Sequence, residues 1–508
     1  MVEKSESVDK STNIDRRKYL QTAGALAAGL AIGGAAGWFT RPAEVVTEKV
    51  TETLTATVTG GAAAAVTSVN DWVKKVSAPY KGTTVKIVTE GTPPSAWVKE
   101  VLVPEFQTVS GINVEIELAS WDDAYKKSIL DAEQKAGTLD AYYIDELENA
   151  ALFMQKGYVQ DLYALWKEHP ELYYPDLDPA DLIPVKFFTI DGKLGGLPFE
   201  CYMRPYAYRK DLFEDPKEQA NFKAKYGLDL KPAKTWEEYE RIAEFFCRPE
   251  QDMYGHTCMP AWMPGDQHDF LMTYGVTGHG ISVGRKASVA QGGRVDDPAS
   301  LDWLKRYLKL LKYAPPGIQA FSWEDMSAQF LAGRIAQGIL YADSLAQITN
   351  PKVSRVAGKV GVSLCPIEPK HCQWYVPTIY GDMGSWQISS SSGNAEATLI
   401  FLQWLTSKEI AAREMEELGT MCSRTSLASS ALADKIDAKF GWSFFKVYRE
   451  ALTGGALSGP KIPMVELLSA YDPMVSWFSK VLTGEVSPED CLRELAKDID
   501  AKMKELGW

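Results

Sequence analysis

The chain has 508 residues, of which 45% are hydrophobic and 11% aromatic, so it can bury a full core and is too long for one compact unit. Its 54 Lys and Arg against 67 Asp and Glu give a net charge of -13, which argues against non-specific nucleic-acid binding, because neutralising phosphates requires clustered basic side chains. The composition also excludes a disordered or collagen-like protein. We therefore expect two or three folded domains with an acidic surface.

Residues 1–40 are typical of an export signal or membrane anchor. The segment 15–21 (Asp-Arg-Arg-Lys-Tyr-Leu-Gln) leads into an uncharged run from Tyr19 to Thr40 that is mostly Ala and Gly. The paired arginines resemble a twin-arginine signal, S/T-R-R-x-F-L-K, although Asp15, Tyr19 and Gln21 replace its usual Ser/Thr, Phe and Lys. An ordinary anchor with a basic start is the alternative, since the 22-residue run would form a helix about 33 Å long. We expect an exported protein that is anchored at, or released from, the extracellular face of the membrane.

Residues 41–80 are rich in Thr, Val and small residues. A segment of this composition buries too little apolar surface to build a core. We therefore predict a stalk or linker between the signal and a folded body that begins at residue 81.

Seven cysteines in an exported chain leave at least one unpaired. Cys247 with Cys258, and Cys365 with Cys372, are near enough in sequence to be joined through short loops. A histidine beside each pair makes a metal site the alternative, but neither has a second spaced pair of ligands. We favour disulfides or buried thiols and expect no metal or other cofactor. Because no cysteine precedes Cys201, a lipid-modified N-terminal cysteine is excluded.

From residue 81 the pattern alternates between strand and helix. The predicted strands are 84–89, 112–118 and 139–144, and the predicted helices contain residues 97–109, 121–137 and 147–156. Alternation of this kind indicates a parallel sheet with crossover helices. Ligands bind such sheets outside the carboxyl ends of the strands, where Glu90, Asp145 and Glu146 lie.

The second half continues in a similar way. Residues 193–199 predict a short strand that ends at Pro198-Phe199, followed by Glu200, and residues 235–238 form a capping box that opens an amphipathic helix. Helices are predicted at 298–313, 394–405 and after Ser407; 333–341 is a helix end running into a strand that finishes on Tyr341, and 384–389 is a strand.

Several of these segments resemble, in order and spacing, the family-1 extracellular solute-binding proteins of ABC transporters, which include the maltose-binding proteins. The matching segments are 197–199, 208–213, 235–238, 333–341 and 393–405. The resemblance spans about residues 81–430. Arg209 stands where the family has Asn, and Tyr341 where Trp is common.

The resemblance implies an α/β, two-lobe periplasmic-binding-protein-like fold of type II, with the ligand cleft between the lobes. Residues 81–198 and 385–424 would form the first lobe, and residues 199–384 and 425–508 the second. Residues 197–201 and 380–384 would be the crossing strands of the hinge. Such a protein binds a sugar or oligosaccharide by hinge closure, delivers it to membrane permease subunits and catalyses no reaction.

Sugars present hydroxyl groups and apolar faces, so their sites need carboxylates or amides together with flat aromatic rings. The cleft positions of the family, carried over to this chain, are Glu90, Asp145, Glu146, Glu200, Tyr202, Tyr341, Asp382 and Met383. Trp262, in a Pro-rich loop, and Trp323, at a helix start, are added as candidate stacking rings.

Simpler roles stay open for several of these residues. Glu200 and Tyr202 would pack in the hinge, Asp145 would cap the following helix, and Glu146 would be solvated surface. The two tryptophans would each anchor a loop, and Trp386 is expected to be a packing residue.

Two other functions compete with sugar binding. An exported polysaccharide hydrolase would use two carboxylates, but nothing in the sequence fixes such a pair. Residues 280–284 match a serine nucleophile elbow by letters, yet no hydrophobic strand precedes them and no helix pattern follows. The same fold binding a peptide, polyamine or metal complex is the second alternative. Several uncompensated carboxylates in the cleft would favour a cation, whereas one or two beside aromatic rings would favour a neutral sugar.

Overall fold

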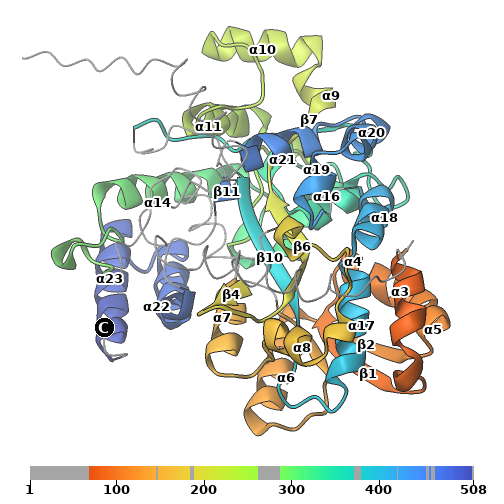
Figure 1. Cartoon of the computed structure of the whole chain (residues 1–508). Coiled ribbons are helices and arrows are strands. Elements are labelled where there is room, and N and C mark those ends of the chain that lie inside the picture. Colours follow the sequence, from red (N-terminus) through yellow and green to blue (C-terminus); the bar gives the residue numbers. More distant parts are fainter. Residues whose placement is uncertain are drawn as a thin grey trace, which may run out of the picture.

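The computed structural model describes residues 68–144, 147–183, 188–260, 286–370, 379–419, 422–453, 457–458 and 464–505. Its strands form two main sheets, and β6 and β10 run side by side through the centre of the molecule (Figure 1). Within these ranges, no helix combines the length and the apolar character needed to cross a membrane.

The larger sheet has six strands and contains the alternating region predicted from the sequence. Its strands are β1 (Thr84–Glu90), β2 (Asn113–Ala119), β3 (Ala141–Ile144), β6 (Leu197–Arg204), β10 (Ile379–Ile388) and β11 (Leu457–Ser458). β1 lies between β2 and β3, parallel to both, as the crossover pattern predicted. β10 is antiparallel to β3 and to β6 and parallel to β11, so it connects the early strands to the late ones.

The second sheet is smaller and antiparallel. β7 (Tyr206–Arg209) is its central strand, between β8 (Gln337–Ile339) and β9 (Val360–Ser363). Only Pro205 separates β6 from β7, so the chain passes directly from the larger sheet to the smaller one. A separate hairpin pairs β4 (Thr189–Ile190) with β5 (Lys193–Leu194).

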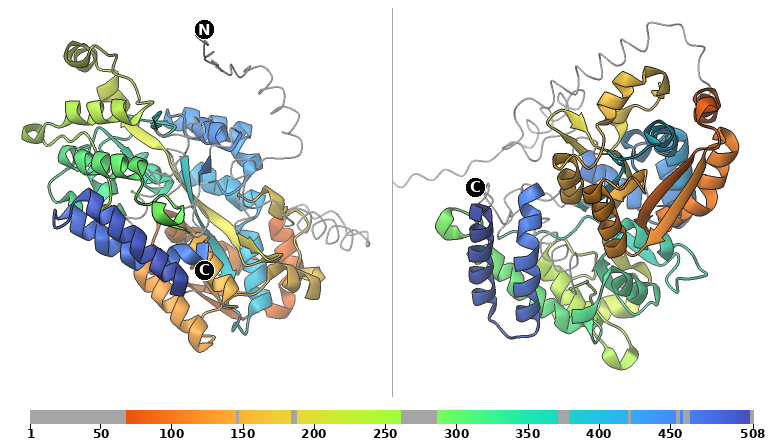
Figure 2. Two further views of the ribbon diagram at one scale, coloured as in Figure 1. Left: turned by 90° about the vertical axis from the view of Figure 1, so that its left-hand side faces the viewer. Right: turned by 90° about the horizontal axis from the view of Figure 1, so that it is seen from below.

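Helices surround both sheets. In chain order up to the end of β7 they are α3 (Val69–Val76), α4 (Pro93–Trp97), α5 (Val103–Ser110), α6 (Trp121–Gln134), α7 (Leu147–Gln155) and α8 (Leu162–Glu168). Next come α9 (Lys210–Phe213), α10 (Pro216–Tyr226), α11 (Trp236–Phe246), α14 (Pro298–Leu310), α15 (Trp323–Leu331), α16 (Ala342–Ile348), α17 (Ala395–Leu405) and α18 (Lys408–Leu418). The last are α19 (Thr425–Ala428), α20 (Ala431–Phe440), α21 (Phe444–Thr453), α22 (Met464–Leu482) and α23 (Pro488–Glu505), and the last two lie side by side (Figure 2).

The predicted capping residues explain where two of these helices begin. Thr235 Oγ1 accepts a hydrogen bond from the backbone N–H of Glu238 at 3.2 Å, and the Glu238 carboxylate accepts one from the N–H of Thr235. Ser407 Oγ accepts from the N–H of Ile410 at 3.4 Å at the start of α18. These side chains satisfy N–H groups that have no partner inside a helix.

The predicted stalk is wrong from residue 69 onward. α3 occupies residues 69–76, and Val69, Trp72 and Val73 are buried in the main core. The indole of Trp404 also donates a hydrogen bond to Asn70 Oδ1 at 2.7 Å. One tryptophan with two valines on the same face is enough to anchor a short helix, so the folded body starts before residue 81.

Of the two interpretations offered for Cys247 and Cys258, a disulfide or thiols, the structure shows thiols. Cys258 is buried with the hydroxyl of Tyr307 3.9 Å from its sulfur, and Cys247 is half-buried. Cys365 is also a buried thiol without a disulfide partner, and its burial raises its pKa to about 12. Its predicted partner, Cys372, lies outside the described residues. Buried thiols, the other interpretation of these cysteines, therefore describe Cys258 and Cys365.

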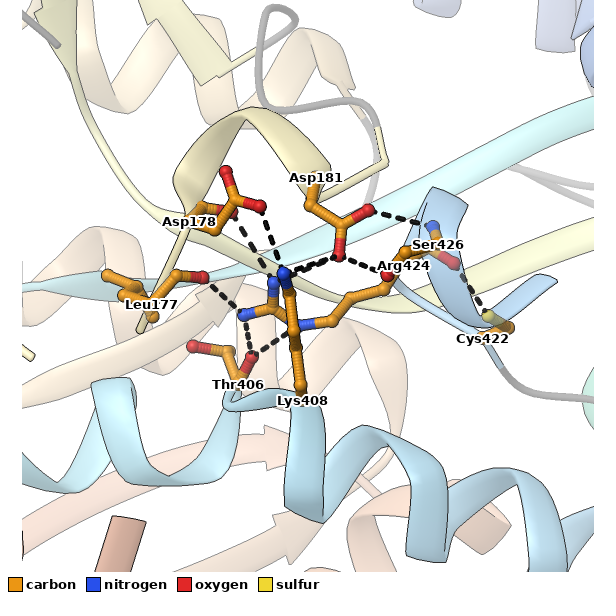
Figure 3. A network of polar contacts seen from close by, with 8 residues as sticks. All are labelled: Leu177, Asp178, Asp181, Thr406, Lys408, Cys422, Arg424 and Ser426. Atoms are coloured by element: carbon orange, nitrogen blue, oxygen red, sulfur yellow. Dashed lines mark hydrogen bonds and ion pairs between the residues drawn. The ribbon is translucent and has the colours of Figure 1, made fainter. Parts of the chain in front are cut away.

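A buried arginine joins the segment before β4 to the end of α17 and the start of α19 (Figure 3). The guanidinium of Arg424, 0% exposed, donates to the carbonyl oxygens of Leu177 at 2.7 Å and Thr406 at 2.5 Å. It also lies 3.4 Å from the carboxylate of Asp181, which in turn accepts hydrogen bonds from Ser426 at 2.7 and 2.6 Å. One side chain thereby joins the segment at residues 177–181 to segments more than 220 positions later in the chain.

Candidate functional site

The paired strands β6 and β10 contain several of the predicted site residues. Tyr202 pairs with Asp382 and Cys201 with Met383, after which the register shifts before Ser385 pairs with Pro198. The side chains of Tyr202, Asp382 and Met383 lie outside the description, so their predicted contacts with ligand stay predictions.

The register shift falls at Gly384, which lies against the ring of Tyr143 on β3. A Cβ atom at position 384 would come within 2.0 Å of the Tyr143 hydroxyl oxygen. Trp386, two residues further on, is fully buried beside the rings of Tyr143 and Phe199, with centroids 5.0 and 6.1 Å away. Trp386 is therefore a packing residue, as predicted, and the crossing strands are tightly fitted here.

Glu200 lies inside β6, not after the end of a strand as predicted from Pro198. The strand continues through this proline, which faces Ser385 of β10. The Glu200 carboxylate is 0% exposed and accepts hydrogen bonds from Ser95 Oγ at 2.9 Å and Thr92 Oγ1 at 3.1 Å. Charge-assisted hydrogen bonds of this kind compensate for burying a carboxylate.

The two hydroxyl groups belong to the segment that follows β1. Glu90 is the last residue of β1 and is buried. Thr92 caps α4 by accepting from the N–H of Ser95 at 3.1 Å, and Ser95 Oγ lies 3.1 Å from Thr89 Oγ1. The end of β1, the start of α4 and the centre of β6 are therefore joined by one buried polar network, at the sheet edge where parallel strands bind ligands.

Tyr341 and Arg204 form the other side of this region. The predicted strand stops at Ile339, and Tyr341 is instead the N-cap residue of α16. The guanidinium carbon of Arg204, at the end of β6, lies 4.5 Å from the centroid of the buried Tyr341 ring. This distance permits a cation–π interaction. A guanidinium nitrogen of Arg204 also donates to the carbonyl oxygen of Ile339 at 3.2 Å.

α16 brings the two sides together. It follows directly after Tyr341 and contacts both α4, which contains Ser95, and β6, which contains Glu200 and Arg204. The groups assembled here are carboxylates, hydroxyls, a guanidinium and an aromatic ring. They can bind a polar solute by hydrogen bonding, charge and ring contact. Among the described residues, no group of His, Cys, Asp and Glu is arranged to hold a metal ion.

Comparison with known proteins identifies the family of the chain. Residues 89–412, more than half of the chain, match the family described as bacterial extracellular solute-binding protein. The chain belongs to this family. The family is a non-enzymatic component of transport, so this solute-binding protein captures its ligand without converting it.

Individual relatives support the fold of this solute-binding protein. A probable amino-acid ABC transporter periplasmic-binding protein from Sinorhizobium fredii is 26% identical over 414 residues, which are 80% of this chain and 86% of the relative. The ribitol complex of an ABC transporter solute-binding protein from Agrobacterium radiobacter has a TM-score of 0.70 at 22% identity, covering 83% of this chain and 99% of that one. Maltose-bound MalE3 of T. maritima has a TM-score of 0.68 at 18% identity, covering 82% and 99%. The α/β periplasmic-binding-protein fold predicted from the sequence is confirmed.

Of the remaining predicted ligand residues of this solute-binding protein, the structure describes only Trp323. Trp323 is half-buried at the first position of α15, which contacts α16. Asp145, Glu146 and Trp262 lie outside the described residues, so nothing tests their predicted roles.

Sequence reasoning missed four residues of the region: Thr92, Ser95, Arg204 and Asp343. Thr92 precedes two prolines, a pattern typical of a helix N-cap, and this pattern indicates the start of α4. Asp343 lies two residues after Tyr341, close enough to a predicted ligand residue to have been considered. No sequence pattern singles out Ser95 or Arg204, because only folding brings Ser95 to Glu200 and Arg204 to Tyr341.

Proposed function

We propose that this protein is the solute-binding component of an ABC importer and that it binds a sugar, sugar alcohol or oligosaccharide. The observation that carries the proposal is the contact of α16 with α4 and β6. These elements bring together the hydroxyl of Ser95, the buried carboxylate of Glu200 and, through Arg204, the ring of Tyr341 at the start of α16. Hydroxyl-rich ligands are bound by this combination of groups. The structures from A. radiobacter and T. maritima contain ribitol and maltose.

An amino acid is the second candidate ligand. The relative from S. fredii is named for an amino-acid transporter. The region also contains Arg204 together with the carboxylates of Glu200 and Asp343. A guanidinium and a carboxylate are the partners that the two charged groups of an α-amino acid require.

We further propose two lobes with the boundaries predicted above, apart from an earlier start of the first lobe at α3. The strands β1 to β3 would belong to the first lobe and β7 to β9 to the second. β6 and β10 would then be the hinge strands, and the solute would bind beside Glu90, Glu200 and Tyr341. Closure follows if the solute contacts both lobes, because it then stabilises the closed conformation selectively. The closed form would be the one presented to the permease.

A ligand screen tests the proposed function. Purified protein would be heated with ribitol, D-mannitol, maltose, L-leucine or putrescine, and ligands that raise the melting temperature would be titrated by calorimetry. We expect at least one sugar or sugar alcohol to stabilise the protein. No stabilisation by any of the five compounds would contradict the proposal, and stabilisation by L-leucine alone would replace it with the second candidate.

Two substitutions then test the site. Tyr341→Ala removes the ring, and Glu200→Gln keeps the shape of the side chain while removing its charge; we expect each to weaken binding about tenfold or more. Tyr226→Ala is the control, because Tyr226 is a half-buried tyrosine on α10 that packs on Phe222 and Phe245. Unchanged affinity in both site variants would remove Tyr341 and Glu200 from the site.

Export by a twin-arginine signal, with anchoring or release at the outer face, is a separate part of the proposal. Arg16 and Arg17 are the residues on which it depends. Changing both to lysine should retain the protein inside the cell if the twin-arginine route is used. Unchanged export, measured by cell fractionation, would favour an ordinary basic anchor.

A further inference from the structure

Asp343 is a buried carboxylate with an open hydrogen-bonding position. It lies in the first turn of α16, two residues after Tyr341, and is 3% exposed. Its Oδ1 atom has no hydrogen-bond partner among the residues described by the structure. Burying an unpaired carboxylate oxygen opposes folding. Because Glu414 also has buried oxygens without a partner among the described residues, it is the position of Asp343 in the fold that distinguishes it.

The elements around Asp343 suggest a function for its Oδ1 atom. α16 contacts α4 and β6, which contain Thr92, Ser95 and Glu200. On its other side α16 contacts α15, where Ser327 Oγ lies 2.5 Å from Ser344 Oγ. α16, which contains Asp343 in its first turn, thus packs against the two elements that contain the hydroxyl-and-carboxylate network of the larger sheet.

Glu200 and Asp343 differ in one respect. Glu200 already accepts hydrogen bonds from two hydroxyl groups of the protein, whereas Asp343 Oδ1 accepts none from the described residues. We propose that Asp343 binds the solute directly, accepting through Oδ1 a hydrogen bond from a hydroxyl or ammonium group of the ligand. This inference rests on the proposed function and adds to it a residue that selects ligands with a donor at one position.

The charged environment of Asp343 bears on which donor is bound. On the elements packed against α16, the charged residues are Glu200 and Arg204 of β6 and Glu324 and Asp325 of α15, and α4 has none. Burial raises the pKa of Asp343 to about 6, and Glu324 adds to the increase, while the backbone N–H of Ser344 opposes it.

The two kinds of donor make different demands on protonation. An ammonium group needs the ionised carboxylate, so affinity would fall about tenfold per pH unit below about 6. A sugar hydroxyl also bonds to the protonated acid, so its affinity would change little with pH.

Two substitutions of Asp343 separate these possibilities. Asp343→Ala removes the acceptor and should weaken any bound ligand about tenfold or more. Asp343→Asn keeps an acceptor oxygen and removes the charge, so it should weaken an ammonium ligand about tenfold and a sugar less. Because Asp343→Asn removes a buried charge, it should leave the melting temperature at pH 8 unchanged or raised.

Glu414→Gln is the matched control. Glu414 is 0% exposed, neither of its carboxylate oxygens has a partner in the described parts of the chain, and it lies on α18, which packs on α17, α19 and α20. This variant should bind ligand as the unmodified protein does. The ligands are the five compounds of the screen, titrated by calorimetry between pH 5 and 8.

The outcomes separate this inference from the proposed function. If the unmodified protein binds none of the compounds, the proposed function fails and the inference fails with it. If the protein binds a compound but Asp343→Ala binds it within twofold as tightly, the inference alone is overturned. It is equally overturned if both Asp343 variants lose affinity together with a fall in melting temperature, because that result indicates a structural residue.

Discussion

Replacing Arg424 by methionine tests how much of the stability of the larger-sheet region depends on one buried guanidinium. Methionine keeps much of the volume of the side chain but donates no hydrogen bonds. The variant would leave the carbonyl oxygens of Leu177 and Thr406 buried without the donors that now lie at 2.7 and 2.5 Å. An unsatisfied buried acceptor costs about 1–3 kcal/mol, and removal of one partner of a buried ion pair about 3–5 kcal/mol.

The structure favours the lower part of this range. Asp181, the ion-pair partner, keeps its two hydrogen bonds from Ser426 and lies 3.7 Å from the ammonium group of Lys408. We therefore expect Arg424→Met to lower the free energy of unfolding by about 3 kcal/mol, out of the roughly 5–15 kcal/mol that is common for a folded protein.

Equilibrium unfolding in urea, followed by circular dichroism, measures the change. Arg413→Met is the control, because Arg413 also contacts carboxylates, those of Glu105 and Glu417, but is 34% exposed. Exposed ion pairs contribute about 0–1 kcal/mol, so the control should unfold close to the unmodified protein. A shift for Arg424→Met no larger than that of the control would refute the argument.

Three further predictions concern stability. Burial raises the pKa of Glu414 well above its ordinary value, so the contribution of the protonated side chain to stability is present at acid pH and is lost as the pH rises. Glu414→Gln should therefore become more stable relative to the unmodified protein from pH 5 to pH 8 in urea titrations. A difference in stability that stays constant over this range would contradict the prediction. Burial lowers the pKa of His256 to about 3, so between about pH 6.5 and pH 3 the histidine is protonated in the unfolded chain but not in the folded one, which destabilises the folded protein. His256→Asn should therefore lose less stability than the unmodified protein between pH 7 and 4 in thermal melts. Thr235→Ala breaks the capping box with Glu238 and should cost about 1 kcal/mol, whereas Thr235→Ser should cost little; equal costs would argue against capping.

The regular parts of the fold could be predicted from the sequence because local patterns determine them. Alternation of apolar and polar residues located β2, and capping side chains located the starts of α11 and α18. β6 was cut short because Pro198 reads as the end of a strand. It is accommodated here opposite Ser385 on β10, a pairing that only the tertiary structure reveals.

The site was less predictable than the fold. The position of Tyr341 came from resemblance, but its contact with Arg204 joins residues 137 positions apart, and no local pattern encodes such a contact. The hydroxyl partners of Glu200 lie more than 100 positions before it in the chain. The capping pattern at Thr92 indicates the start of a helix, but it does not reveal that the side chains of Thr92 and Ser95 face β6.

The close fit between Gly384 and the Tyr143 ring has a consequence for evolution. Any larger residue at 384 would meet the phenol within 2.0 Å and would have to displace a ring that also packs on Trp386. Substitution at either position alone therefore leaves a clash or a void, whereas a larger residue at 384 combined with a smaller one at 143 preserves the volume. Across relatives, these two positions should covary, with the bulk of one inversely related to that of the other.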